Sequence, residues 1–172
     1  MRIVLGSDDA VAKRVLEIQH AAYAVEARLI GYDAIPPLHE TVTELRSQPL
    51  IFLGVSCDRT LAGVLGYRRD ADTVDIDRLA VDPMFFRRGL ATRLLRELFA
   101  RERDATRFTV STGLGNEPAV GLHERFGLRV VGGTEQAPDA MLMVLRRGPS
   151  GPANVHRTTR PNDAFTAPDN DA

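Results

Sequence analysis

The sequence is poor in cysteine, charge imbalance and long hydrophobic runs, and each shortage excludes a class of protein. Cys57 is the one cysteine among 172 residues, so the chain forms neither an internal disulfide nor a multi-cysteine zinc site. The 22 basic residues face 23 acidic ones, and a net charge of −1 argues against nucleic acid held by bulk attraction. The longest apolar run, residues 50–55, has the length of a buried strand and is too short to span a bilayer.

Residues 1–7 contain too short an apolar run for a signal peptide. With one cysteine and no such segment, we expect a cytoplasmic protein that has no membrane partner. Arginine is abundant: of the 22 basic residues, Lys13 is the one lysine and the others are arginine. A GC-rich genome would explain that excess, and phosphate recognition by clustered arginines is the functional alternative.

Apolar spacing predicts an α+β domain with the element order β-α-α-β-β-β-α-β-α-β-β. We expect one central, mixed, largely antiparallel twisted sheet flanked by helices, with a stiff, extended loop at residues 35–38. The first helix has Ser7 as its expected N-cap. The predicted strands are 2–5, 50–57, 61–69, 73–81, 108–112, 128–131 and 141–145, and the predicted helices are 7–29, 39–47, 89–103 and 117–125.

The apolar pattern stops near residue 147. Val155 and Phe165 are the large apolar residues that remain in the last 25 positions, so this segment buries too little surface to offset the entropy of ordering it. We therefore expect residues 1–147 to form the domain and residues 148–172 to form a disordered tail. The alternative is a tail that docks on the domain through Phe165.

A strand that ends at Pro83, followed by a tight loop and a helix, is the strongest chemical signal. Gly89 and Ala91 are small at the start of that helix, where small residues let an anion approach the free N–H groups of the first turn. Arg87 and Arg88 add positive charge beside it. Residues 87–107 hold seven arginines and three acidic residues, a local charge of +4.

This run resembles motif A of the GNAT superfamily, the acyl-CoA-dependent N-acetyltransferases, whose signature is Gln/Arg-x-x-Gly-x-Gly/Ala after a strand ending in Leu-x-Val-x-Pro. Phe86 stands where the family has Gln or Arg. Residues 116–128 resemble the family's motif B, Asn-x-x-Ala-x-x-Leu-Tyr-Glu-Lys-x-Gly-Phe, with His123 in place of the tyrosine. The predicted element order matches the family from residue 1 to about residue 147.

The resemblance implies acetyl-CoA as co-substrate and no metal. It places the pantetheine arm in a wedge between strands 73–81 and 107–112, against the backbone of the first strand. Amides at the start of the following helix would hold the pyrophosphate, and Asn116 would meet the arm from the other side. The cofactor-binding residues so expected are Leu79, Ala80, Val81, Arg87, Arg88, Gly89, Leu90, Ala91, Thr92 and Asn116.

Asp75 is the candidate catalytic base, because it lies four residues before Leu79, where family members often carry a catalytic glutamate. Strand alternation places Asp75 and Asp77 on one face, ~7 Å apart. Two like charges at that distance could raise the pKa of one carboxyl group, or attract a cationic amine. An exposed strand face that merely carries acids is the alternative.

His123 is the candidate acid that returns a proton to the sulfur, since it lies one helical turn after Ala119 and shares its face. The alternative is a histidine that lines the cofactor without transferring a proton. For the acceptor site, the resemblance points to the N-terminal helices, their connecting loop and strand 73–81. The candidate substrate-binding residues are Glu26, Tyr32, Glu40 and Asp77.

The leading hypothesis is transfer of an acetyl group from acetyl-CoA to a primary amine of a small molecule or peptide. A non-catalytic acyl-CoA-binding sensor is the alternative, motivated by Phe86 and His123. A toxin that acetylates aminoacyl-tRNA is a third hypothesis, which the arginines of residues 87–107 keep open. The sequence names neither the amine nor the acyl chain, and it leaves a homodimer open.

Overall fold

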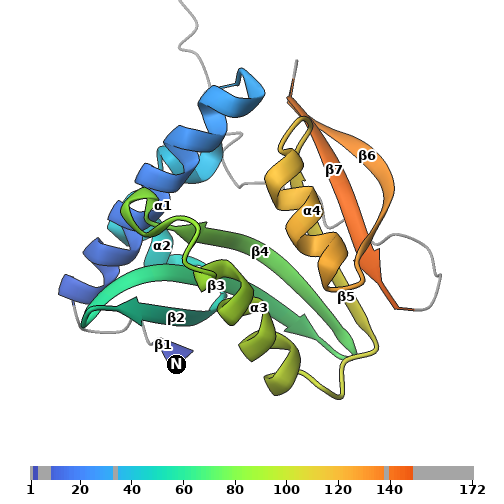
Figure 1. The fold of residues 1–172 in the computed structure, drawn as a ribbon, viewed down its shortest axis with the longest axis horizontal. Coiled ribbons are helices and arrows are strands. Elements are labelled where there is room, and N and C mark those ends of the chain that lie inside the picture. Colours follow the sequence, from blue (N-terminus) through green and yellow to red (C-terminus); the bar gives the residue numbers. More distant parts are fainter. Residues whose placement is uncertain (1, 4–8, 33–34, 138–139, 149–172) are drawn as a thin grey trace, which may run out of the picture.

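Within residues 2–3, 9–32, 35–137 and 140–148, which the computed structural model describes, seven strands form one sheet (Figure 1). The strands are β1 (Arg2–Ile3), β2 (Ile51–Cys57), β3 (Thr60–Asp70), β4 (Thr73–Val81), β5 (Arg107–Gly113), β6 (Arg129–Ala137) and β7 (Ala140–Arg147). Their spatial order is β1-β2-β3-β4-β5-β7-β6, and every pair is antiparallel except β4 with β5. The predicted α+β class with a mixed, largely antiparallel sheet is confirmed.

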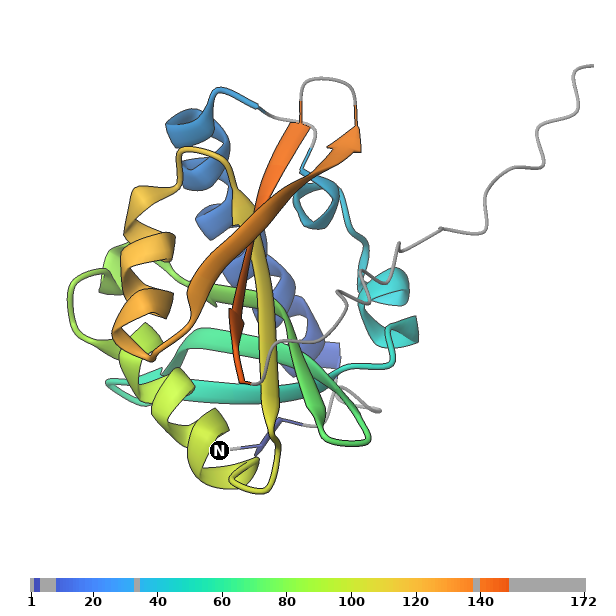
Figure 2. The same ribbon diagram turned by 90° about the vertical axis from the view of Figure 1, so that its right-hand side faces the viewer.

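Two helices cover each face of this sheet (Figure 2). The helical segments are α1 (Asp9–Ile30), η1 (Pro36–Leu38), α2 (Val42–Ser47), η2 (Pro83–Phe85), α3 (Leu90–Arg101) and α4 (Glu117–Arg125). Ile18 of α1 and Leu45 of α2 pack on Phe52 and Val64, whereas Leu94 and Leu98 of α3 pack against the opposite face. None of the described helices is long and apolar enough to cross a membrane.

Three local expectations need correction. The segment at residues 35–38 is a 3₁₀ turn, in which the Leu38 N–H donates to the Ile35 carbonyl at 2.9 Å, because a proline φ near −65° suits a 3₁₀ turn as well as an extended chain. The second helix begins at Val42, since Thr41 and Glu44 form a capping box. Strand β6 continues through Gly132 to Ala137, because pairing with β7 overrides the weak strand propensity of glycine.

Two further expectations concern segments outside the described residues. The Ser7 cap of the first helix and residues 4–5 of the first strand fall there. Of the expected tail, residues 148–172, all but Gly148 also lie outside the described part of the chain.

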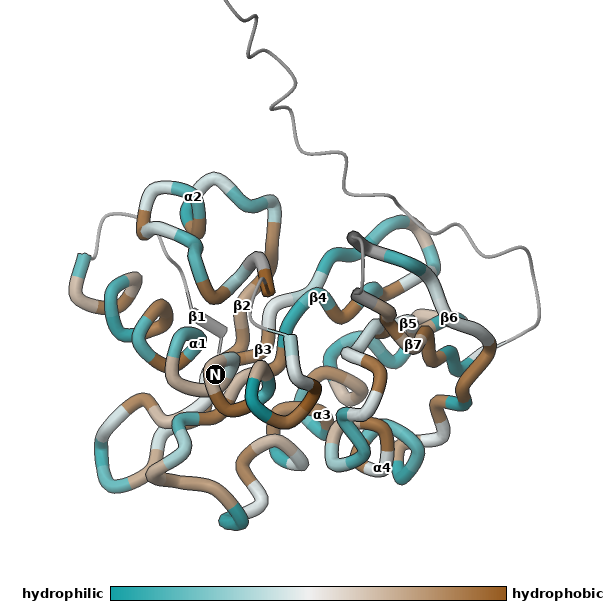
Figure 3. Tube along the Cα trace, turned by 90° about the horizontal axis from the view of Figure 1, so that it is seen from above, coloured by the Kyte–Doolittle hydropathy of each residue, from teal (hydrophilic) through white to brown (hydrophobic). Residues whose placement is uncertain are grey.

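The parallel pairing of β4 with β5 ends early. It runs from Thr73 opposite Arg107 to Ile76 opposite Val110, and the rest of β4 has no partner in β5. At the same point β3 skips one residue of β4, since Gly66 faces Arg78 and Tyr67 faces Ile76, so Asp77 is the extra residue of a β-bulge. A bulge bends its strand. Beyond it β4 diverges from β5 and lies between the part of the molecule that holds β1–β3 and the part that holds β5–β7 (Figure 3).

Gly66, beside this bulge, offers a test of the packing. A Cβ there would lie 2.9 Å from Cγ of Arg78 and 3.1 Å from Cε1 of Phe52, so we expect Gly66→Ala to lower the free energy of unfolding by about 1–3 kcal/mol. Gly132→Ala is the matched control, because a Cβ there meets nothing within 4 Å. Urea unfolding of both variants measures the difference, and equal stabilities would contradict this account of the bulge.

Candidate active site

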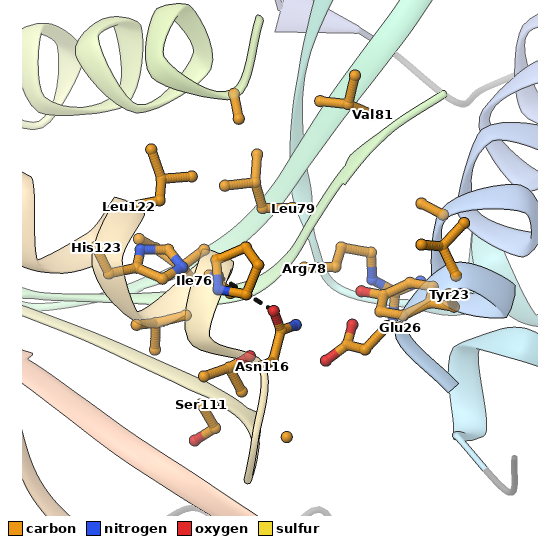
Figure 4. A pocket seen from close by; sticks show the side chains of 18 of the residues that line it. Tyr23, Glu26, Ile76, Arg78, Leu79, Val81, Ser111, Asn116, Leu122 and His123 are labelled. Carbon is orange, nitrogen blue, oxygen red and sulfur yellow. Dashed lines mark hydrogen bonds between the residues drawn. The ribbon is translucent and has the colours of Figure 1, made fainter. Parts of the chain in front are cut away.

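A cavity of about 930 Å³ opens where β4 leaves β5. Its walls come from α1, β4, β5, α4 and the start of α3 (Figure 4). Leu79, Val81 and Leu122 supply apolar side chains on one side, and Tyr23 and Glu26 lie on the other. The cavity therefore reaches from the face that carries α3 and α4 to the face that carries α1.

The start of α3 forms one end of the cavity. Gly89 is the N-cap of α3 with φ 72°, Arg87 before it has φ 60°, and no side-chain hydrogen bond caps this helix. Glycine adopts this left-handed conformation without strain. Gly89, Leu90 and Ala91 line the cavity, so the open N–H groups of the first turn of α3 belong to its wall, an arrangement suited to an anion.

Most of the predicted cofactor-binding residues gather in this cavity. Ala80 and Arg88 are the two that do not line it. Ala80 is buried on the α1 face of the sheet, so its backbone alone could contribute. Arg88 turns toward Asp58 at 3.5 Å and lies over the ring of Phe85 at 5.3 Å, so its side chain is outside the cavity wall in this structure. The predicted residues that line the cavity are Leu79, Val81, Arg87, Gly89, Leu90, Ala91, Thr92 and Asn116.

Asn116 is both a cavity residue and a helix cap. Its Oδ1 accepts a hydrogen bond from the N–H of Ala119 at 3.2 Å, drawn as a dashed line in Figure 4. This bond satisfies one of the open donors of α4 and fixes that helix against the cavity. Asn116 itself is buried.

His123 lines the cavity from α4 and is 3% exposed. Its Nδ1 is buried and has no hydrogen-bond partner in the described structure. Burial lowers the pKa of His123 to about 4, because desolvation disfavours the imidazolium form. The ring is therefore neutral at pH 7, so any proton that His123 gives to the sulfur would have to come from the neutral imidazole.

Asp75 and Asp77 both line the cavity, yet they do not form an isolated pair of like charges. The guanidinium of Arg68 lies between them, with Nη2 2.9 Å from Asp77 and Nη1 4.0 Å from Asp75. Asp77 also accepts from Nε of Arg78 at 2.8 Å, and Asp75 accepts from Oγ1 of Thr109 at 2.6 Å. The repulsion between the two carboxylates, which strand alternation predicted, is thus offset by the positive charges of Arg68 and Arg78.

Two of the four predicted substrate-binding residues lie elsewhere. Glu40 is buried beneath the cavity, where its Oε2 binds Nη1 of Arg78 at 2.6 Å and Nε2 of Gln19 at 3.0 Å. It is a partner of Arg78 rather than a residue of the wall, because a buried arginine needs a paired carboxylate. Tyr32, past the end of α1, does not line the cavity either.

Glu26 and Tyr23 occupy the wall that α1 contributes. Glu26 Oε1 would lie 3.4 Å from a Cβ at Gly113, so Glu26 reaches the end of β5. Burial raises the pKa of Tyr23 above its usual range, and the negative charge of Glu26 adds to that rise. Figure 4 shows both side chains beside Arg78.

Sequence reasoning missed Tyr23, Arg68 and Arg78 as cavity residues. The helical spacing of Tyr23 and Glu26, one turn apart, could have indicated Tyr23. Nothing local indicated the two arginines, whose positions depend on the β3–β4 register. Among the described residues, no group of three or more His, Cys, Asp or Glu is placed to hold a metal ion.

The burial of His123 makes stability depend on pH. The unfolded imidazole takes up a proton near pH 6.5 and the folded one only near its pKa of about 4, so stability falls as the pH falls below 6.5. We expect His123 to account for a loss of about 2 kcal/mol between about pH 7 and about pH 5. His123→Phe should lack this part of the loss in urea unfolding, whereas the exposed His39→Gln should keep it. Identical pH slopes for wild type and His123→Phe would contradict the assignment.

Residues 13–128 match the Acetyltransferase (GNAT) family. The UPF0157 protein YqkA of Bacillus subtilis is 32% identical over 139 residues, which are 81% of this chain and 40% of that protein. The chain thus spans less than half the length of this relative.

Two solved structures show the same fold. The ribosomal-protein-S18-alanine N-acetyltransferase of Escherichia coli has a TM-score of 0.66 at 16% identity, covering 88% of this chain and 97% of that one. The PaiA N-acetyltransferase of Thermoplasma acidophilum, in complex with coenzyme A, has a TM-score of 0.61 at 15% identity, covering 77% and 91%. The family match, the fold and the cavity at the parting strands agree: this chain belongs to the GNAT acetyltransferase family.

Proposed function

We propose that the chain transfers an acetyl group from acetyl-CoA to a primary amine of a small molecule or peptide. The cavity at the β4–β5 divergence carries this proposal, because it joins an anion-binding helix terminus to a wall that holds carboxylates. Both reactants can then meet in one space, which supports direct transfer in a ternary complex.

The chain's own groups fit acetyl-CoA along the cavity. The N–H groups at the start of α3 and the side chain of Arg87 would hold the pyrophosphate. The backbone of Leu79 and Val81, beyond the last β4–β5 pair, would bind the pantetheine arm as an added strand. Asn116 and α4 would close the other side.

Asp75 would take the proton that the attacking ammonium must lose. It lies at the point where β4 leaves β5, and its hydrogen bond from Thr109 fixes the orientation of the carboxylate. The amine nitrogen then forms a bond to the acetyl carbon as the carbon–sulfur bond breaks. A backbone N–H of the diverging strand would stabilise the negative charge that develops on the acetyl oxygen.

His123 would act as a neutral hydrogen-bonding group for the sulfur. Its buried Nδ1 has no partner among the described residues, so a bound ligand could supply one. Since the lowered pKa keeps the ring neutral, the departing thiolate would receive its proton from water. The neutral state of His123 also supports the sensor hypothesis, because a protein without a proton-donating residue could bind acyl-CoA and turn it over poorly.

A thiol-release assay with acetyl-CoA and a panel of amines, run beside calorimetric titration with CoA, tests the proposal. Release that depends on both acetyl-CoA and an amine supports transfer. Binding of CoA with no release for any amine would overturn transfer and favour the sensor. Salt-sensitive binding of tRNA with acetylation of its aminoacyl group would instead favour the toxin.

The role of Asp75 predicts a pH-dependent defect. Without its carboxylate, the ammonium must lose its proton to solvent, which becomes easier as the pH rises. We expect Asp75→Asn to lower kcat by about a hundredfold or more near pH 7 and by much less near pH 9. Asp70→Asn, at the exposed end of β3 and outside the cavity wall, is the control. A pH–rate profile of Asp75→Asn that parallels the wild type would remove Asp75 from this role.

A further inference from the structure

The acceptor end of the cavity carries excess negative charge. Two cations and three anions of α1, β3 and β4 form its wall, and a fourth anion is buried directly beneath it. The cations are Arg68 and Arg78, the wall anions are Glu26, Asp75 and Asp77, and the buried anion is Glu40. On the part of the wall that α1, β3 and β4 supply, four carboxylates against two guanidinium groups give a formal charge of −2. The other charged residues that line the cavity are Arg87, Arg125 and Glu135.

Both arginines are already engaged. Arg78 binds Glu40 at 2.6 Å and Asp77 at 2.8 Å, and its side chain is 4% exposed. Arg68 binds Asp77 at 2.9 Å and approaches Asp75 to 4.0 Å. The positive charge of each guanidinium is therefore already compensated by a carboxylate of the chain.

Glu26 is the carboxylate of this group for which the described part of the chain provides no hydrogen bond and no ion pair. It is half-buried on the wall, reaches the end of β5, and lies beside the ring of Tyr23 (Figure 4). A carboxylate in a partly desolvated place gains from a positively charged partner. The aromatic face next to it favours the same kind of partner.

The buried Nδ1 of His123 marks the opposite side of the same cavity. Within the described ranges this polar atom has no partner, and its side chain is 3% exposed, so a ligand is expected to enter the space that His123 lines. The donor end is thus distinct from the acidic end. A molecule that spans from Asp75 to Glu26 would lie wholly on the acidic side.

We propose that the acceptor is an alkyl diamine, in which one nitrogen reacts at Asp75 while the second, still an ammonium, binds Glu26 beside Tyr23. This inference rests on the proposed acetyl transfer and specifies its substrate class. The second ammonium supplies the positive charge that the wall lacks. An acceptor whose second group is a carboxylate would meet the negative charge of Glu26 and two arginines that already bind carboxylates of the chain, so it is disfavoured.

Three amines of matched chain length test this proposal with acetyl-CoA in a thiol-release assay. They are butylamine, butane-1,4-diamine and 4-aminobutanoate. We expect kcat/KM for the diamine to exceed that for butylamine by about tenfold or more, since a charged hydrogen bond is gained, and 4-aminobutanoate to be the poorest. Raising the salt concentration should reduce this preference, because it rests on charge.

Glu26→Gln should reduce the preference for the diamine to about twofold or less, mainly through KM, because the second ammonium loses its partner. Glu17→Gln is the matched control, since Glu17 lies on the same helix, is exposed and is absent from the cavity wall. It should keep the wild-type preference.

The outcomes separate this inference from the proposed function. Equal kcat/KM values for butylamine and the diamine in the wild type would overturn the diamine proposal and leave acetyl transfer intact. Absence of thiol release with every amine, while CoA binds, would overturn both. The wild-type comparison and its salt dependence decide the question even if Glu26→Gln fails to fold.

Discussion

The end of parallel pairing between β4 and β5 is the constraint on which the site depends. Beyond Ile76 and Val110 the backbone N–H and C=O groups of the two strands no longer pair with each other. Buried backbone groups of this kind need other hydrogen-bond partners. The bulge at Asp77 turns the strand at the same place, so the separation is built into the β3–β4 register. The gap is consequently a permanent feature of the sheet that an extended ligand can fill.

Arg78 connects this gap to the helices that form the acceptor wall. Its guanidinium joins Asp77 of the bulge to Glu40, which precedes α2, and to Gln19 of α1. A buried charge of this kind costs more than it contributes unless every donor is paired, so its value lies in fixing geometry. We infer that the network sets the distance between α1 and β4, and with it the width of the acceptor end.

Local patterns predicted what local chemistry determines. The start of α3 at Gly89 and the cap of α4 at Asn116 follow from residues that lie next to each other in the chain. The ion pairs of Arg68 and Arg78 could not be predicted, because the bulge at Asp77 in the β3–β4 register decides which side chains face each other. The burial of His123, which lowers its pKa to about 4, could not be predicted either, since elements distant in the sequence cause it.

A chain with a net charge of −1 can still hold two strongly opposed ends within one cavity. The start of α3 with Arg87 attracts a polyanion, while Glu26 and the carboxylates around Arg68 repel it. We infer that this opposition would orient acetyl-CoA before any specific contact forms and would draw an ammonium to the other side. With the proposed mechanism such a site needs no proton-donating side chain: Asp75 would remove a proton on the acidic side, and solvent would restore one to the thiolate.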